Sequence, residues 1–335
     1  MIILKGQDDH TNLLPRYHFI RGRDSLTEIK NPRRNFLDSF KKRSMEITMF
    51  NTPHGGEAII IRNKKKAILY DFGEGHDDEN PELGKRLGSF LKCKKAKLQA
   101  IVASHNHQDH VNAFAPMLDR YHSSILRDDV KFYHQAEERN SNFYTIMMKN
   151  IDCEKIPKIP IRKWQQKKIN KWNGSQTINL FCGPQIGGKS RRFYRSILMR
   201  VPFGKAAFLF TGDIDTSPTE NRLITNDKTN RFLKNIDALQ ITHHGSHNGT
   251  GAKFLNFTSS ALFFVASAKD KKHDFDPRTE RRVERYVDGK GNKFDVPYYP
   301  IFNTHWEGRI TLRTDGRERT LDNTTGTLFE VETDK

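Results

Sequence analysis

The chain has 335 residues, of which 35% are hydrophobic, and its 57 Lys and Arg residues outnumber the 40 Asp and Glu residues to give a formal net charge of +17. Its longest apolar run, around residues 261–266, is far shorter than the roughly 20 residues of a membrane-spanning helix, and its first residues lack the basic and apolar regions of a secretion signal. The three scattered cysteines argue against a disulfide framework and a cysteine-based zinc site. We therefore predict a cytoplasmic, globular protein with no membrane segment, and the positive charge favours nucleic acid or another phosphate-bearing partner.

Residues 1–44 are polar, mixed in charge and without sustained hydrophobic periodicity. We interpret them as an N-terminal extension, with one helix expected near residues 35–43, in front of a single domain at residues 45–335. This extension offers a surface for a protein partner or for a second copy of the chain.

The first half of the domain begins with three predicted strands, at residues 45–50, 57–62 and 66–73, and a glycine turn separates the first two. A helix is predicted at 81–92, a short buried strand at 98–104, a second helix at 111–121 and a strand at 130–134. Such a strand, loop, helix and strand form an α/β unit, in which functional residues gather at the carboxyl end of the strand.

The second half is again rich in strands, and residues 135–175 between the halves give no clear pattern. Strands are predicted at 178–181, 196–201, 207–210, 238–242 and 262–266, a helix at 277–287, and a closing strand at 309–312. Two strand-rich halves predict two β-sheets packed in a sandwich with helices outside, which is an α/β architecture.

Four potential metal ligands occur within six residues, directly after the buried strand at 98–104: His105, His107, Asp109 and His110. Imidazole and carboxylate groups are ligands that zinc and manganese accept. A polar surface turn would explain a single histidine pair. The spacing H-x-H-x-D-H after an apolar strand favours a metal site instead.

Further ligands are expected where two later strands end. Asp213 follows an apolar strand, and Gly212 allows the close backbone approach that a carboxylate bridging two metals needs. His243 and His244 also follow an apolar strand and precede Gly245. We expect one of this pair to bind metal and the other to face the substrate or a phosphate oxygen. We assign His243 as the ligand and His244 as a catalytic residue that protonates the leaving group or contacts the oxyanion.

These motifs resemble the metallo-β-lactamase superfamily, and their order, H-x-H-x-D-H, T-G-D and H-H-G-S, resembles the hydrolase domain of the ComEC/Rec2 competence proteins and its free-standing relatives. Residues 52–56, 70–73 and 303–311 resemble other elements of that family, so the resemblance covers about residues 45–315. It implies an αββα sandwich with a dinuclear metal site in the groove at the edge of the two sheets.

The chain departs from these relatives at the ligand that closes the second metal site. Relatives have a histidine in the segment that corresponds to residues 273–277, where this chain has Asp276 at the expected ligand position. Asp276 would shift the preference from zinc toward manganese or magnesium. The alternatives are that His273 is the ligand or that the second metal binds weakly. ComEC proteins also carry a membrane channel that this sequence lacks, so a role in DNA uptake does not transfer.

Two divalent metal ions, zinc or manganese with magnesium as an alternative, would activate a water for attack on a phosphoryl group, and Asp109 is the candidate for orienting that water. Basic clusters interleaved with aromatic residues are candidates for binding phosphates and unpaired bases. The clusters contain Arg191, Arg192, Arg195, Lys163, Lys167 and Lys168.

The sequence therefore predicts a phosphodiesterase or nuclease that acts on DNA or RNA. One alternative is a hydrolase of a small phosphodiester, of the cyclic-nucleotide or phosphocholine type. A second is a non-catalytic, partner-binding subunit, which the intact set of five predicted ligands disfavours.

Overall fold

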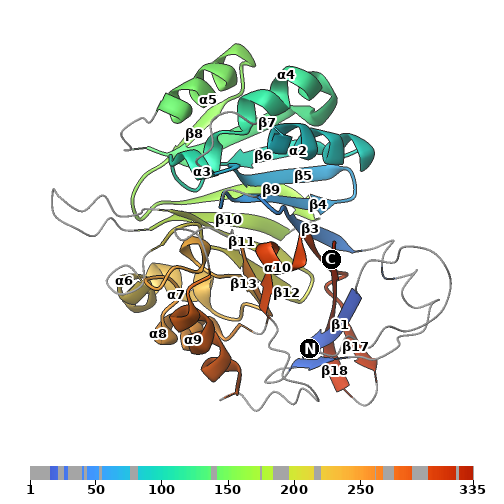
Figure 1. The fold of residues 1–335 in the computed structure, drawn as a ribbon, viewed down its shortest axis with the longest axis vertical. Helices are drawn as coiled ribbons and strands as arrows, with labels where there is room; N and C mark the ends of the chain where they lie inside the picture. Colours follow the sequence, from blue (N-terminus) through green and yellow to red (C-terminus); the bar gives the residue numbers. More distant parts are fainter. Residues whose placement is uncertain are drawn as a thin grey trace.

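The computed structural model describes residues 16–21, 26–28, 40, 44–52, 55–75, 82–136, 142–173, 176–183, 196–214, 220–260, 262–266, 275–288, 301–321 and 324–334. Two mixed β-sheets pack face to face, and helices cover the outer face of each (Figure 1). The predicted αββα sandwich of the metallo-β-lactamase fold is confirmed.

The first sheet has eleven strands in the described residues, and its middle is the predicted meander of β3 (Met45–Met49), β4 (Ala58–Asn63) and β5 (Lys66–Phe72). The direction changes after β5, because β6 (Lys97–Val102), β7 (Leu126–Gln135) and β8 (Lys158–Ile161) follow as parallel neighbours. The carboxyl ends of these parallel strands therefore meet at one edge of the sheet.

The second sheet has the same change of direction. Its antiparallel part consists of β9 (Gln166–Asn173), β10 (Gln176–Cys182), β11 (Ile197–Phe203) and β12 (Ala206–Phe210). Its parallel part continues from β12 through β13 (Ala238–Gln240), β14 (Leu262–Val265) and β15 (Ile301–Asn303). The predicted ligands follow β6, β12 and β13, so the parallel parts of both sheets supply the site.

The main core lies between the sheets, where the buried side chains of both inner faces form one cluster. Tyr70 of β5 joins the two sheets: its ring centroid is 5.6 Å from that of Phe210, and its hydroxyl donates a hydrogen bond of 2.8 Å to the carbonyl oxygen of Ile197. Burying a tyrosine is favourable when its hydroxyl has such a partner. These contacts fix β5 and β11 relative to each other beside the ligand loops.

Helices form two further cores on the outer faces. The first sheet is covered by α2 (Glu82–Cys93), α3 (Gln108–Val111), α4 (Phe114–Ile125) and α5 (Asn142–Cys153). The second is covered by α6 (Asn221–Thr225), α7 (Asp227–Leu233), α8 (Ala252–Thr258) and α9 (Pro277–Asp288) (Figure 1). None of the helices in the described ranges is both long and apolar enough to cross a membrane.

The structure has elements that the sequence analysis did not predict, both in residues 135–175 and near the termini. The strand predicted at 309–312 is β16 (Ile310–Thr314), and α10 (Thr304–Glu307) precedes it. This strand does not close the fold, because β17 (Glu318–Leu321) and β18 (Thr324–Thr333) follow it. β18 pairs with β16 and with β1 (Arg16–Arg21), and β1 pairs with β2 (Leu26–Glu28). Of the helix predicted at 35–43, only Phe40 is among the described residues, and it is helical and buried.

Candidate metal centre

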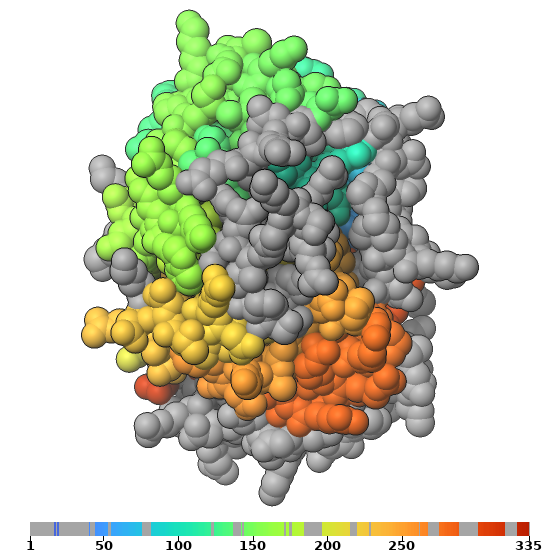
Figure 2. Space-filling view, turned by 90° about the vertical axis from the view of Figure 1, so that its left-hand side faces the viewer, coloured from blue at the N-terminus to red at the C-terminus, as the bar shows by residue number. Residues whose placement is uncertain are grey.

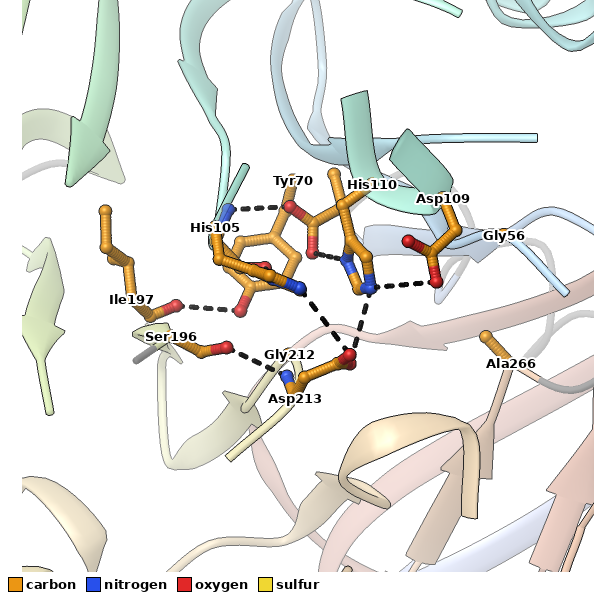
Figure 3. Close-up of polar contacts among 12 residues, drawn as sticks. Gly56, Tyr70, His105, Asp109, His110, Ser196, Ile197, Gly212, Asp213 and Ala266 are labelled. Carbon is orange, nitrogen blue, oxygen red and sulfur yellow. Dashed lines mark hydrogen bonds and ion pairs between the residues drawn. The ribbon is translucent and has the colours of Figure 1, made fainter. Parts of the chain in front are cut away.

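The loop after β6 and the first turn of α3 carry the first four predicted ligands. His105 and His107 precede α3, whereas Asp109 and His110 lie within it. His105, Asp109 and His110 are buried, with at most 4% of each residue exposed. The short helix therefore directs Asp109 and His110 toward the space that His105 faces (Figure 3).

Asp213 lies at the centre of the cluster, and its two carboxylate oxygens face different histidines (Figure 3). Its Oδ2 atom is 3.6 Å from Nε2 of His105 and 3.8 Å from Nε2 of His243. Its Oδ1 atom is 3.3 Å from Nε2 of His110 and 3.8 Å from Nε2 of His244. A carboxylate placed in this way can bridge two metal ions.

The ligand atoms form two groups that could each hold a metal ion. One consists of His105, His107 and Asp213, the other of Asp109, His110 and His244, and the atoms of each group lie within 4.8 Å of one another. The structure thus brings six of the eight predicted metal or catalytic residues into these two groups, and His243 contacts the first through Asp213.

Two glycines allow the backbone to approach closely enough to build the centre. A Cβ atom on Gly73 would lie 1.9 Å from the carbonyl carbon of Asp109. Gly212 has a φ of +52°, and a Cβ there would lie 2.8 Å from the hydroxyl oxygens of Ser104 and Ser196. These positions therefore require glycine, because backbone and buried side chains fill the space of any larger residue.

Hydrogen bonds behind the ligands orient their rings. Asp71 accepts a bond of 2.7 Å from the backbone N–H of Ser104, and its other carboxylate oxygen is 2.9 Å from Nδ1 of His110. Nδ1 of His244 is 3.0 Å from the carbonyl oxygen of Ala266. With Nδ1 held in this way, Nε2 of each ring faces the centre, as in metal sites whose histidines have outer hydrogen-bond partners.

The pKa values show how strongly the groups interact. Burial alone would lower the pKa of His110, but the carboxylates of Asp213, Asp71 and Asp109 raise it well above its ordinary value. Burial opposes ionisation of Asp213 as well, yet the surrounding histidines hold its pKa well below the usual range. The pKa of His244 is raised to about 9, because the attraction of Asp213 and the hydrogen bond to Asp109 outweigh its burial.

The residues fit a divalent metal. Nε2 of His110 and Oδ1 of Asp213 are buried and make no hydrogen bond with the described residues, although they lie only 3.3 Å apart. Burying such polar atoms costs free energy unless a partner compensates, and a cation between them would be that partner. The nitrogen-rich donor set, completed by carboxylates, suits zinc and manganese.

Glu57 is a site residue that the sequence analysis missed. It is fully buried, its two carboxylate oxygens have no hydrogen-bond partner among the described residues, and it forms a third potential metal-binding group with His110 and Asp213. Burial, and secondarily the charge of Asp71, raise the pKa of Glu57 to about 8. Its position directly after Gly55 and Gly56, at a strand start, was the available signal.

The structure does not bring Asp276 into either group of ligands. Its backbone N–H donates to the carbonyl oxygen of Gly245, and its carboxylate accepts hydrogen bonds from the backbone and the guanidinium of Arg278. These hydrogen bonds lower the pKa of Asp276 to about 2. The alternative ligand, His273, lies outside the described residues.

The predicted nucleic-acid contacts are not members of these ligand groups, or they lie outside the described residues. Lys163 precedes β9, and Lys167 and Lys168 lie on it, at the end of the second sheet. Arg191, Arg192 and Arg195 are outside the described residues.

Comparison with known proteins agrees with this architecture. The family model described as the metallo-β-lactamase superfamily matches residues 51–144, a segment that includes His105, His107, Asp109 and His110. No curated protein sequence matches the chain.

The solved structures that match this chain have low sequence identity and TM-scores below 0.5. Human tRNase Z, short form, is 13% identical with a TM-score of 0.44, and the match covers 67% of this chain and 93% of that one. The chemotaxis sensor ODP, solved as a peroxy diiron species, is 14% identical with a TM-score of 0.37, over 76% of this chain and 94% of that one. A metallo-β-lactamase from Pontibacter korlensis is 16% identical with a TM-score of 0.29, over 50% and 67%. The resemblance to ComEC is not confirmed by these comparisons.

Proposed function

We propose that this protein is a metal-dependent phosphodiesterase that cleaves DNA or RNA. The observation that carries the proposal is the pair of buried ligand groups on either side of Asp213. Two metal ions held in such a site lower the pKa of a bound water and neutralise the charge that develops on a phosphoryl group.

The residues of the chain would act by holding the metal sites, a ligand ring and a water in position. Asp213 would hold the two sites at a fixed separation through its two oxygens, and Asp71 would hold the ring of His110 through Nδ1. Oδ2 of Asp109 lies 3.4 Å from Nε2 of His244, so Asp109 is placed both to bind the second metal and to orient a water beside it.

The two adjacent histidines take roles opposite to those expected from the sequence. His244 is 3% exposed and belongs to the second ligand group, which favours metal binding. The side chain of His243 is 25% exposed and lies at the rim of the centre. His243 is therefore the better candidate to protonate a leaving group, because it can reach a substrate that enters from solvent.

The net charge of +17 supports a polymeric substrate. A strand with many phosphates binds a positively charged protein more strongly than a single phosphodiester does, through the release of counterions. The proposal therefore names nucleic acid as the substrate class, and leaves small phosphodiesters as an outcome of the test.

The test is hydrolysis of labelled single- and double-stranded DNA and RNA in the presence of manganese, zinc or magnesium. The double variant Asp109→Ala, His110→Ala removes two ligands of the second group, and Asp128→Ala, Lys131→Ala is the matched control at two exposed positions. Metal-dependent cleavage by the wild type and the control, absent in the first variant, is the expected result. Hydrolysis of small phosphodiesters without cleavage of any nucleic acid would contradict the proposal.

A further inference from the structure

Four arginines form one face of α9. Arg278, Arg281, Arg282 and Arg285 are spaced three and four residues apart, which places them on the same side of a helix. The opposite side packs into the core through buried residues, among them Val283 and Val287. The arginine face is therefore held in place by the apolar face behind it.

This face lines an open groove between α8 and α9, with a volume of about 560 Å³. Ala252 and Asn256 of α8 form the other wall, Tyr286 of α9 also lines the groove, and none of the described lining residues is acidic. Both helices belong to the orange surface in the lower part of Figure 2. Four guanidinium groups around a groove with no carboxylate among its described lining residues make the site positive, although one of the four is paired with an aspartate beside the groove.

The arginines are not equivalent. Arg278 forms an ion pair of 2.8 Å with Asp276, and Arg282 donates hydrogen bonds to the carbonyl oxygens of Gly249 and Thr250. Arg281 and Arg285 are exposed and have no ion pair with any carboxylate in the described part of the chain. These two are available to bind a ligand.

The groove is tied to the segment that carries the histidine pair. The hydroxyl of Thr279 on α9 donates a hydrogen bond of 2.8 Å to the carbonyl oxygen of Ser246, and Asp276 bonds to Gly245. Gly245 and Ser246 directly follow His244 in the sequence. The arginine face therefore begins beside the rim of the metal centre.

We propose that the α8–α9 groove binds the phosphate backbone of a nucleic-acid strand whose scissile bond lies at the metal centre. This proposal rests on the proposed function and adds a binding site to it. Arg281 and Arg285 contact phosphates, since a guanidinium can bind two phosphate oxygens at once. Asn256 lines the same groove and is exposed, so its side-chain amide lies beside the strand.

The test is binding of a fluorescent single-stranded oligonucleotide by the full chain, measured by anisotropy at several salt concentrations with the metal chelated to prevent cleavage. The variant Arg281→Gln, Arg285→Gln removes both charges, and Arg281→Lys, Arg285→Lys keeps them. The control Lys92→Gln, Lys131→Gln removes two exposed charges from α2 and from β7 of the first sheet.

Each phosphate contact on a single strand contributes about 0.7 to the slope of log K against log salt, so the Gln variant is expected to lower the slope by about 1.4 and to weaken binding at least about tenfold. The Lys variant and the control should retain the wild-type slope.

An unchanged slope in the Gln variant, in a protein that still binds the oligonucleotide, would overturn the groove proposal and leave the proposed function intact. Failure of the wild type to bind any oligonucleotide would overturn both. Tighter binding to phosphatidylserine vesicles than to the oligonucleotide, lost in the Gln variant, would assign the groove to a lipid surface and overturn the proposal.

Discussion

At the scale of single residues, the centre depends on glycine as much as on histidine and aspartate. In Gly73→Ala, the new Cβ atom would lie 1.9 Å from the carbonyl carbon of Asp109 and 2.3 Å from the backbone nitrogen of His110, so the ligand segment must move. We expect a loss of about 3 kcal/mol in the free energy of unfolding and loss of metal binding. Chemical denaturation and metal analysis of the purified variant measure both.

Gly183→Ala is the matched control, since the nearest heavy atom to its Cβ would be 3.7 Å away. This ordinary contact predicts no loss of stability and a small gain from the stiffer unfolded chain. Equal effects of the two substitutions would show that crowding at Asp109 is not what requires a glycine at position 73.

Glu57 is expected to strengthen metal binding and to destabilise the metal-free protein. Its buried carboxylate oxygens lack hydrogen-bond partners in the described structure, and it groups with His110 and Asp213. In Glu57→Gln, we expect the chelated protein to unfold at the same temperature or higher, because a buried ionisable group is removed. The affinity for manganese or zinc should fall about tenfold or more.

Thermal unfolding with and without metal, together with a calorimetric titration, measures these effects. The exposed Glu82 on α2 provides the control, because Glu82→Gln should change neither quantity. A chelated Glu57→Gln protein that unfolds at a lower temperature and binds metal as well as the wild type would contradict this account of Glu57.

At the scale of elements, one arginine joins three strands of the first sheet. Arg313 of β16 lies 3.1 Å from Glu46 of β3, and 2.8 Å from both Glu330 and Glu332 of β18. In Arg313→Met, these largely buried carboxylates lose their shared cation. We expect a loss of about 3 kcal/mol in the free energy of unfolding, measured by denaturation.

Arg127→Met is the matched control. Among the described residues, Arg127 pairs with the exposed Asp129 alone, and surface pairs contribute less than about 1 kcal/mol. A loss for Arg313→Met no larger than that of the control would show that the buried pairs do not hold the strands together.

The same cluster predicts a dependence of stability on pH. Burial alone would raise the pKa of Glu46, but Arg62 and Arg313 lower it below the ordinary value. The stabilisation is therefore complete above the pKa of an unfolded glutamate, about 4.3, and is lost as the pH falls through the lower, folded pKa. Unfolding free energies measured between about pH 6 and pH 3 should fall less steeply in Arg313→Met than in the wild type, and an identical pH dependence would contradict this role.

Local pattern was sufficient to predict the elements that carry the ligands. β6, β12 and β13 are short and apolar and end at polar motifs, so their sequences alone indicated strands and sites. Local pattern failed to predict elements that depend on pairing between segments far apart in the sequence. β1 is stabilised through its pairing with β18, more than 300 residues away, and neither segment has an apolar alternation strong enough to predict it.

At the scale of the whole molecule, the sequence predicted the sandwich of two sheets and the two groups of metal ligands. It did not predict which other charged residues lie around these groups. Glu57 directly precedes β4 and Asp71 lies on β5, and both carboxylates interact with His110. The local spacing of residues in the sequence does not reveal this arrangement. Asp276 was assigned by alignment with a motif, whereas its carboxylate binds Arg278 on the following turn of chain. In the sequence, the arginines of α9 resemble the solvent-exposed side of an ordinary helix. That they line a groove follows only from the position of α8 beside α9.

The central claim is that this chain holds two metal ions on either side of Asp213, and anomalous scattering from a manganese-soaked crystal tests it most directly. We predict two anomalous peaks, one beside His105 and His107 and the other beside Asp109, His110 and His244, both in contact with Asp213. No peak at the centre, or a single peak that leaves one of the two ligand groups without a metal at saturating manganese, would contradict it.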